Sequence, residues 1–258
     1  MSRTIFLVPV EGRVRYGLGL EWQRRLASER IDGSLAADVV LLLEHEPVLT
    51  LGRGAADPHV VAAPDLLERA GVDRFEVERG GDVTYHGPGQ LVGYPILDLR
   101  GYRKDLHWYL RTLEEAIITA LGVLDAPAFR VPAYTGVWVG DPVRLDEGRD
   151  PTAVHGLVPT GRIRKIASIG VHVSRWVTWH GFALNVTEEP LRSFSLIIPC
   201  GIDGVRMTSL ESEGVEAGAE ALRGALATGF ARAFGADVRI AAPTRPGERV
   251  DLGVPTPP

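Results

Sequence analysis

Residues 79–90 read R-G-G-D-V-T-Y-H-G-P-G-Q, a run that suits neither an ordinary helix nor an ordinary strand. Four glycines and one proline surround Tyr85 and His86. The backbone must therefore turn sharply and approach a neighbour that a Cβ atom would obstruct. Segments 74–78 and 91–99 on either side are apolar enough to be strands. We predict a polar loop on a rigid sheet, where binding sites are often built, although two tight structural turns would also explain an isolated glycine cluster.

The composition is that of a globular chain. It has 258 residues, of which 45% are hydrophobic, so it can bury one substantial core. The formal net charge of −5 argues against a general nucleic-acid-binding protein. The first ten residues lack the apolar core of a signal peptide, and no stretch approaches the ~18 apolar residues of a membrane-spanning helix. We expect a soluble, cytoplasmic protein that binds neither nucleic acid nor membrane.

The periodicity of apolar residues predicts mixed α and β structure. Helical spacing is present in three segments, 18–26, 106–117 and 215–230. Strand patterns are present in four segments, 39–43, 166–173, 182–186 and 238–240. We expect the second helix to lie between Asp105 and Gly122, and the third to end at Gly235. The strands at 166–173 and 182–186 are expected side by side.

The domain organisation follows from shifts in composition. We expect a single domain over residues 1–241, with a larger portion up to about residue 186 and a smaller portion after it. Residues 141–164 are rich in Asp, Gly, Pro and Arg without a clear period, which predicts an exposed insertion. Residues 242–258 hold five prolines and few apolar residues, which predicts a flexible tail.

Cys200 is the sole cysteine and stands in the segment S-L-I-I-P-C-G at 195–201. A single cysteine excludes an internal disulfide and a cysteine-based zinc site. Pro199 restricts the backbone before the thiol, and Gly201 leaves space behind it, so the thiol could be presented at the end of an apolar strand. Such a cysteine is a nucleophile only if a neighbour stabilises its thiolate. Otherwise it is an inert core residue.

A partner for Cys200 can be sought among the basic residues. None of the seven histidines has a spacing that nominates it as a dyad partner or metal ligand. Only two residues are lysines, and Lys104 precedes a helix, where a solvated role is natural. Lys165 instead enters the apolar strand K-I-A-S-I-G-V-H-V, where an unpaired ammonium is costly. Lys165 is the candidate partner, unless it only snorkels from a strand end.

Four segments together resemble the lipoate-biosynthesis octanoyltransferase family. They are R-G-G-D-V-T-Y-H-G-P-G-Q-L-V-G-Y-P at 79–95, K-I-A-S-I-G-V-H-V-S-R-W-V-T-W-H-G-F-A-L-N-V at 165–186, I-P-C-G-I at 198–202 and E-H-E-P-V-L-T-L-G-R at 44–53. The resemblance covers most of residues 35–210. It implies an α/β (α+β) fold like that of biotin and lipoate protein ligases, related to class II aminoacyl-tRNA synthetase catalytic domains, with a mixed sheet flanked by helices.

The resemblance also implies a site. The catalytic dyad falls on Cys200 and Lys165, with no metal and no cofactor. The acyl-binding residues fall on Arg79, Gly80, Gly81, Asp82, Val83, Thr84, Tyr85, His86, Ser168, Ile169, Gly170, Gly181, Phe182 and Ala183. Arg79, Asp82, Thr84 and Tyr85 could equally serve to hold the loop. His86 and His180 are ambiguous between structural and catalytic roles, and Trp176 and Trp179 are left out of the site as core or rim residues.

The implied reaction moves an octanoyl group from octanoyl-acyl carrier protein to a lysine of a lipoyl domain, through an acyl thioester on Cys200. The implied acceptors are the lipoyl domains of 2-oxoacid dehydrogenase E2 subunits and the glycine cleavage H protein, and the enzyme is expected to be a monomer. A charged Lys165 would lower the pKa of the Cys200 thiol below its usual value of about 8.5. Once the cysteine is acylated, Lys165 would act as the base for the incoming lysine.

Three alternatives to this function remain at this point. They are an ATP-dependent lipoate or biotin ligase, an amidotransferase between two lipoyl domains and a non-catalytic binding module. A further expectation concerns docking, because acyl carrier proteins are acidic and this chain is also acidic. Arg162, Arg164 and Arg175 are expected to supply a local positive surface, although they could simply be solvated arginines.

Overall fold

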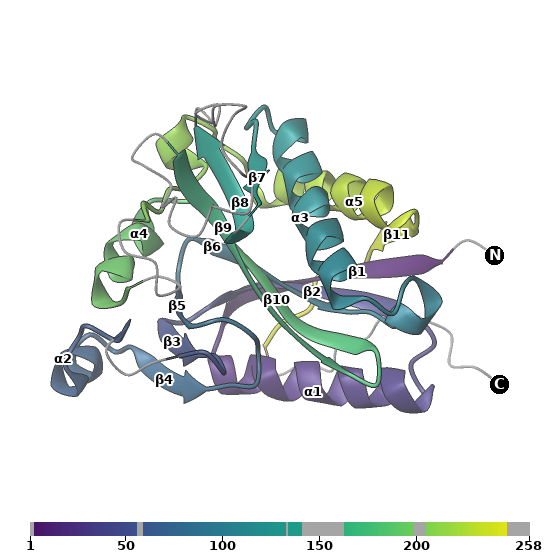
Figure 1. The fold of residues 1–258 in the computed structure, drawn as a ribbon, viewed down its shortest axis with the longest axis horizontal. Helices are drawn as coiled ribbons and strands as arrows, with labels where there is room; N and C mark the ends of the chain where they lie inside the picture. The colour runs from purple at the N-terminus through teal and green to yellow at the C-terminus, as the bar shows by residue number, and fades with distance from the viewer. Residues whose placement is uncertain (1–2, 56–58, 133, 141–162, 199–204, 247–258) are drawn as a thin grey trace, which may run out of the picture.

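The main sheet of the computed structural model crosses the whole molecule (Figure 1). The structure describes residues 3–55, 59–132, 134–140, 163–198 and 205–246. Within these residues the eight-stranded sheet has the order β11-β1-β2-β6-β10-β9-β8-β7. Its strands are β1 (Thr4–Val14), β2 (Asp38–His45), β6 (Gln90–Ile96), β7 (Phe129–Val131), β8 (Tyr134–Gly140), β9 (Ile163–Ser174), β10 (Val177–Asn185) and β11 (Asp237–Ile240). Strands β11, β1 and β2 are parallel and the remaining pairs are antiparallel, so the sheet is mixed as predicted.

Helices cover both faces of this sheet. Helix α1 (Tyr16–Asp32) lies on one face, and α3 (Leu106–Val123) and α5 (Ala219–Phe234) lie on the other (Figure 1). The side chains of β2 alternate accordingly: Leu41 joins the apolar cluster under α1, whereas Leu42 joins the cluster under α3 and α5. Burial on both faces explains why β2 reads as an uninterrupted apolar run.

Capping explains two of the predicted helix ends, whereas α3 continues past the predicted stop at Gly122 and ends at Val123. The Asp105 side chain accepts a hydrogen bond from the backbone N–H of Trp108 and begins α3 where the sequence predicts it. Gly235 adopts a left-handed conformation and ends α5, as expected. The start of α5 differs from the prediction, because Val215 lies before the helix, which begins at Ala219. Strands β9 and β10 pair antiparallel, which confirms that they lie side by side.

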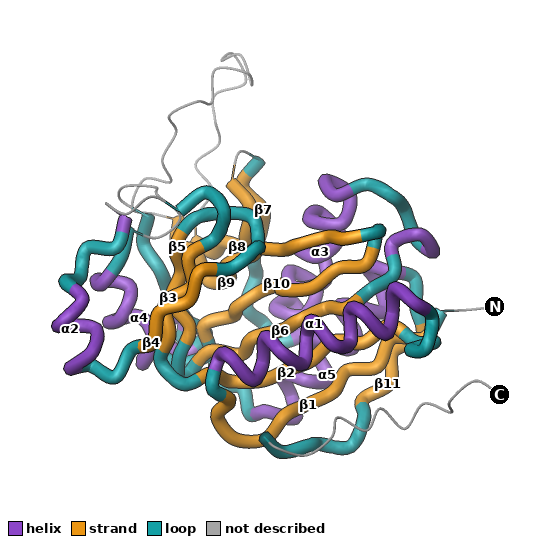
Figure 2. Tube along the Cα trace, turned by 90° about the horizontal axis from the view of Figure 1, so that it is seen from below, coloured by secondary structure: helices purple, strands orange, loops and turns teal. Residues whose placement is uncertain are grey.

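A second, three-stranded sheet has the order β4-β3-β5 and lies beside the N-terminal end of α1 (Figure 2). Its strands are β3 (Val48–Leu51), β4 (Asp73–Glu76) and β5 (Val83–His86), and α2 (Pro64–Arg69) lies next to it. Strand β5 corrects the prediction of a continuous loop over 79–90. Val83, Thr84 and Tyr85 favour extended backbone and pair with β3, so the glycines confine the turns to the two ends of this short strand.

The C-terminal portion completes the main sheet. After residue 186 the chain forms α4 (Glu189–Ser193) and the 3-10 turns η4 (Phe194–Leu196) and η6 (Glu211–Glu213), and then α5 and β11. Strand β11 pairs with β1, and α5 packs along α3. Most of the predicted insertion (141–162) and most of the predicted tail (247–258) lie outside the described residues. Among the described helices, none is long and apolar enough to cross a membrane.

Candidate active site

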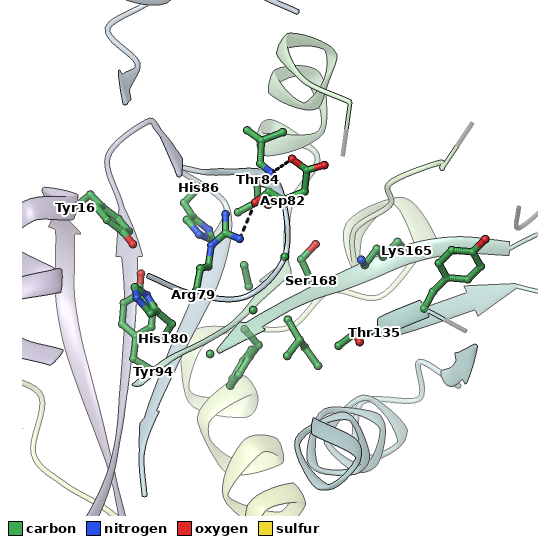
Figure 3. Close-up of a pocket in the computed structure, with 18 residues that line it drawn as sticks. Tyr16, Arg79, Asp82, Thr84, His86, Tyr94, Thr135, Lys165, Ser168 and His180 are labelled. Atoms are coloured by element: carbon green, nitrogen blue, oxygen red, sulfur yellow. Dashed lines mark hydrogen bonds between the residues drawn. The ribbon is translucent and has the colours of Figure 1, made fainter. Parts of the chain in front are cut away.

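A narrow cavity of about 190 Å³ lies between the loop that leads into β5 and the strands β9 and β10. Its wall contains Lys165 and twelve of the predicted acyl-site residues, Arg79, Gly81, Asp82, Val83, Thr84, His86, Ser168, Ile169, Gly170, Gly181, Phe182 and Ala183. Lys165 lies at one end of the cavity, and Tyr16, Tyr94 and His180 lie at the other (Figure 3). The structure thus gathers segments far apart in the sequence around one elongated space.

Two predicted acyl-site residues lie outside the cavity wall. Gly80 donates its backbone N–H to the carbonyl of Val171 and so attaches the loop to β9. The ring of Tyr85 packs edge-on against Phe194, at 6.1 Å between centroids, in the apolar cluster of the small sheet. Both positions support the loop rather than line the space.

The Lys165 side chain is buried, with 2% of its surface exposed. Its Nζ lies 5.4 Å from the centroid of the Trp138 ring, within the range of a cation–π contact. Its backbone N–H donates to the carbonyl of Arg206, and its carbonyl accepts from Thr208 N–H, at 2.8 and 3.0 Å. An ammonium held this way inside the protein can stabilise a negative charge on an adjacent group.

Cys200 lies outside the described residues. The described chain before it runs to Ile198, whose N–H donates to the carbonyl of His59 at 2.8 Å. His59 in turn pairs with the carboxylate of Asp82, a residue of the cavity wall. The pairing of Cys200 with Lys165 therefore stays a prediction.

The loop over the cavity is fastened by Arg79. Its guanidinium is 6% exposed and donates to the hydroxyl and carbonyl of Thr50, at 2.8 and 2.6 Å, and to the carbonyls of Gly80 and Asp82, at 3.2 and 2.7 Å. Gly170 lies directly beneath, where an added Cβ would stand 3.0 Å from the Gly80 carbonyl. The glycine at 170 is needed because the loop backbone rests on the strand.

Uncharged polar groups line the far end of the cavity, and His45 lies behind them against Tyr94. His45 Nδ1 donates to the Val14 carbonyl at 2.8 Å, which leaves Nε2 to accept from the Tyr94 hydroxyl at 2.6 Å. Burial lowers the pKa of His45 to about 4. Burial, followed by the charges of His45 and Arg79, lowers the pKa of His86 to about 3. Both rings are neutral at pH 7, so neither places a positive charge beside a bound ligand.

His180 has the most unusual backbone in the site. It adopts a φ of 55° in the middle of β10, where a non-glycine residue is strained. The side-chain oxygen of Gln23 on α1 accepts the His180 N–H at 2.9 Å, and the imidazole Nε2 lies 3.9 Å from the Glu78 carboxylate. Strain of this kind persists where surrounding contacts hold it, and here it brings the ring to the cavity wall.

Comparison with known families gives this site its context. A sequence model of the lipoyl protein ligase A/B catalytic domain matches residues 15–231. The chain belongs to this family. An octanoyltransferase of Solibacter usitatus is 48% identical over 223 residues, covering 86% of this chain and 90% of its own length. An octanoyltransferase of Gloeobacter violaceus is 45% identical over 235 residues, covering 91% and 92%. These relatives confirm the predicted resemblance to octanoyltransferases.

The fold of this lipoyl ligase-family chain is shared with a solved structure. A putative lipoate protein ligase from T. acidophilum superposes with a TM-score of 0.65 at 18% identity, covering 93% of this chain and 89% of the other. At this identity the comparison shows the fold alone, and it confirms the predicted lipoate-ligase-like architecture. In the part of the chain that the structure describes, no group of three or more His, Cys, Asp or Glu side chains could hold a metal ion.

Several cavity residues were missed by the sequence analysis. Tyr94 lies inside the quoted segment 79–95 but was not singled out there. His180 was named with an ambiguous role, and the structure places it in the cavity wall. Tyr16, Tyr134 and Thr135 also line the cavity, yet lie outside every quoted segment. Only the packing of α1 and β8 against the site brings them there.

The predicted basic surface is not a single patch. Arg164 stands at the start of β9 and Arg175 follows its end, so that an extended strand separates them by roughly 35 Å. Arg164 donates to both oxygens of Glu213, at 2.7 and 2.6 Å, which compensates its charge locally. Arg162 lies outside the described residues, and its role in docking stays a prediction.

Proposed function

We propose that this protein transfers an octanoyl group from octanoyl-acyl carrier protein to a lysine of a lipoyl domain, through a thioester on Cys200. The observation that carries the proposal is the buried ammonium of Lys165 at one end of a narrow cavity. Chains named octanoyltransferase that are 48% and 45% identical to this one support it. The acceptors are the lipoyl domains of 2-oxoacid dehydrogenase E2 subunits and the glycine cleavage H protein.

The cavity suits a linear acyl chain. Its volume of about 190 Å³ is below the ~300–1,000 Å³ of pockets that take drug-sized ligands. Ile169, Phe182 and Ala183 give it apolar walls, and Gly81 and Gly170 expose backbone where side chains would narrow it. Each methylene buried there contributes about 0.8 kcal/mol, so closing the far end with Tyr16 and Tyr94 sets a length preference.

In the first half-reaction the Cys200 thiolate attacks the thioester carbonyl of the donor. A carbon–sulfur bond to Cys200 forms and the bond to the carrier's thiol breaks. The ammonium of Lys165 first stabilises the attacking thiolate and then protonates the departing thiolate of the carrier, which leaves Lys165 as a neutral amine. One thioester replaces another, so the step is nearly isoenergetic and needs no nucleotide. The protein chiefly supplies positioning.

In the second half-reaction the amine of the acceptor lysine attacks the acyl-cysteine. A carbon–nitrogen bond forms, Cys200 leaves as a thiolate, and the neutral amine of Lys165 takes the proton that the acceptor loses. The starting pair of thiolate and ammonium is thereby restored. Because an amide is more stable than a thioester, this step drives the transfer forward.

The test uses octanoyl-carrier protein and a purified lipoyl domain, without ATP. We expect octanoyl transfer to the lipoyl domain, and intact mass of the enzyme should show one bound octanoyl group that is absent in Cys200→Ser. Transfer that requires ATP would indicate a ligase, and transfer only from an octanoylated lipoyl domain would indicate an amidotransferase. A Cys200→Ser enzyme with the normal rate would overturn the thioester step.

A further inference from the structure

Strand β8 is irregular beside the catalytic lysine. Toward β9, Val137 pairs with Ala167, and the next residue, Trp138, pairs with Lys165. Ile166 is therefore an extra residue on β9. Toward β7 the register also shifts, between the pair of Phe129 with Trp138 and the pair of Val131 with Tyr134. Bulges of this kind often re-aim a side chain next to an active site. Gly136, which adopts a φ of 131°, lies inside the shifted stretch on the β7 side and two residues before Trp138.

A buried carboxylate holds Gly136 in place. The backbone N–H of Gly136 donates to Glu114 Oε1 at 3.1 Å, and the Glu114 side chain on α3 is fully buried. The other oxygen of Glu114 accepts from Arg111 Nη1 at 2.7 Å, and Arg130 Nε lies 3.5 Å away. A buried carboxylate with two guanidinium partners and a backbone donor is held in one orientation.

The missing side chain of Gly136 leaves the space that the lysine occupies. A Cβ built there would stand 2.6 Å from Lys165 Cε, 3.2 Å from its Nζ and 2.7 Å from the Ala167 carbonyl. Real Cβ atoms essentially never approach a neighbour as closely as 3.0 Å, so a side chain at 136 would force the lysine side chain, the β9 backbone at Ala167 or both to move. The Trp138 ring centroid lies 5.4 Å from Nζ, so Gly136 and Trp138 together limit where the ammonium can lie.

We propose that Gly136 and Glu114 are positioning residues that set the place of the Lys165 ammonium. Glu114 holds the irregular backbone of β8, and Gly136 leaves room for the end of the lysine side chain. The inference rests on the proposed function, in which this ammonium keeps Cys200 reactive. Neither residue lines the cavity, and both act through Lys165.

The test measures the alkylation of Cys200 by a neutral electrophile across pH, since this sole cysteine makes the signal specific. In Gly136→Ala we expect the pH midpoint of Cys200 alkylation to rise by about one pH unit. Alkylation at pH 7 should then be roughly tenfold slower. Gly33→Ala is the matched control, because Gly33 has a φ of 89° with nothing within 4 Å of its Cβ position. The control should keep the wild-type profile. A wild-type profile in Gly136→Ala would overturn the inference.

A second pair of variants keeps the test decisive if Gly136→Ala does not fold. Glu114→Gln retains an oxygen that can accept the Gly136 N–H, whereas Glu114→Ala leaves that donor unpaired. We expect Glu114→Gln to stay close to the wild-type profile and Glu114→Ala to shift toward higher pH. Equal profiles for Glu114→Ala and the wild type, with the protein folded, would overturn the role of Glu114.

The variant Lys165→Ala distinguishes a failure of the positioning role from a failure of the activation step. If it shifts the titration and Gly136→Ala and Glu114→Ala do not, the lysine activates the thiol but these residues do not position it. If Lys165→Ala itself leaves the profile unchanged, the activation step of the proposed function fails, and the positioning inference fails with it.

Discussion

The Lys165 ammonium lies 5.4 Å from the centroid of the buried Trp138 ring, and the two residues are direct partners across β8 and β9. Such a cation–π contact contributes about 0.5–2 kcal/mol. A smaller aromatic ring keeps part of this attraction, whereas an aliphatic side chain keeps none of it. We expect Trp138→Phe to retain more octanoyl transfer than Trp138→Leu, by roughly three- to tenfold in kcat/KM. Equal losses in the two variants, each measured on folded protein, would show that the ring matters only for packing.

The stability of the protein should fall in mild acid. His45 and His86 have pKa values of about 4 and about 3 in the folded state, because burial disfavours their charged forms. In the unfolded chain a histidine titrates near pH ~6.5, so the unfolded state binds more protons below that pH. The stabilisation that each neutral histidine gives to the folded state is fully present above pH ~6.5. It is lost as the pH falls from there through the folded pKa, by at most ~1.4 kcal/mol of unfolding free energy per pH unit.

Urea unfolding between pH 7 and pH 5 measures this loss. We expect His86→Gln to have a flatter dependence of the unfolding free energy on pH than the wild type. His107→Gln serves as the control, because His107 is exposed. The same slope in His86→Gln and in the wild type would show that His86 is not the group that titrates.

Arg79 should be irreplaceable by lysine. Its guanidinium makes hydrogen bonds to Thr50, Gly80 and Asp82 from a buried position, and a lysine lacks the planar fork to reach all of them. Leaving buried carbonyls without donors costs on the order of 1–3 kcal/mol, so Arg79→Lys should lower the thermal midpoint clearly. The exposed Arg53, changed to lysine in the same way, should stay within about 0.5 kcal/mol of the wild type. Similar thermal midpoints for Arg79→Lys and Arg53→Lys would contradict the role of Arg79 in holding the loop.

The ion pair of Arg164 and Glu213 is partly buried, with 32% and 19% of the two side chains exposed. Reversing Arg164 to Glu places two carboxylates together and should destabilise the protein by about 1 kcal/mol. The exchanged variant, Arg164→Glu with Glu213→Arg, should recover most of that loss. Chemical denaturation of the single and double variants measures the coupling, and no recovery in the double variant would show that the pair contributes nothing.

Ser168 lies on the cavity floor between Lys165 and Arg79 (Figure 3). A larger apolar side chain there should shorten the space for an acyl chain. We expect Ser168→Leu to lower kcat/KM for octanoyl substrate more than for hexanoyl substrate, by about fourfold for each methylene excluded. Ser168→Ala controls for the loss of the hydroxyl and should keep the octanoyl preference. A uniform loss for both chain lengths would place the acyl chain elsewhere.

Local signals in the sequence determined much of the architecture. Asp105 caps α3 and Gly235 ends α5 because capping depends on residues within one turn. The apolar patterns of β9 and β10 were sufficient to predict that they pair. The glycine-rich segment 79–90 marked one wall of the cavity, since close backbone approach requires glycine whatever the neighbour is.

Other features were decided only by the tertiary structure. Val83–His86 forms a strand because β3 offers a pairing edge, which no local pattern reveals. Tyr16 enters the cavity from α1, and Glu114 reaches Gly136 across 22 residues of sequence. A side chain's partner at such a separation depends on how helices and sheet pack. The sequence alone therefore predicted the family, the three long helices, several strands of the main sheet and the candidate dyad. The packing of α1, α3 and β8 decided which further residues surround the lysine and the acyl cavity.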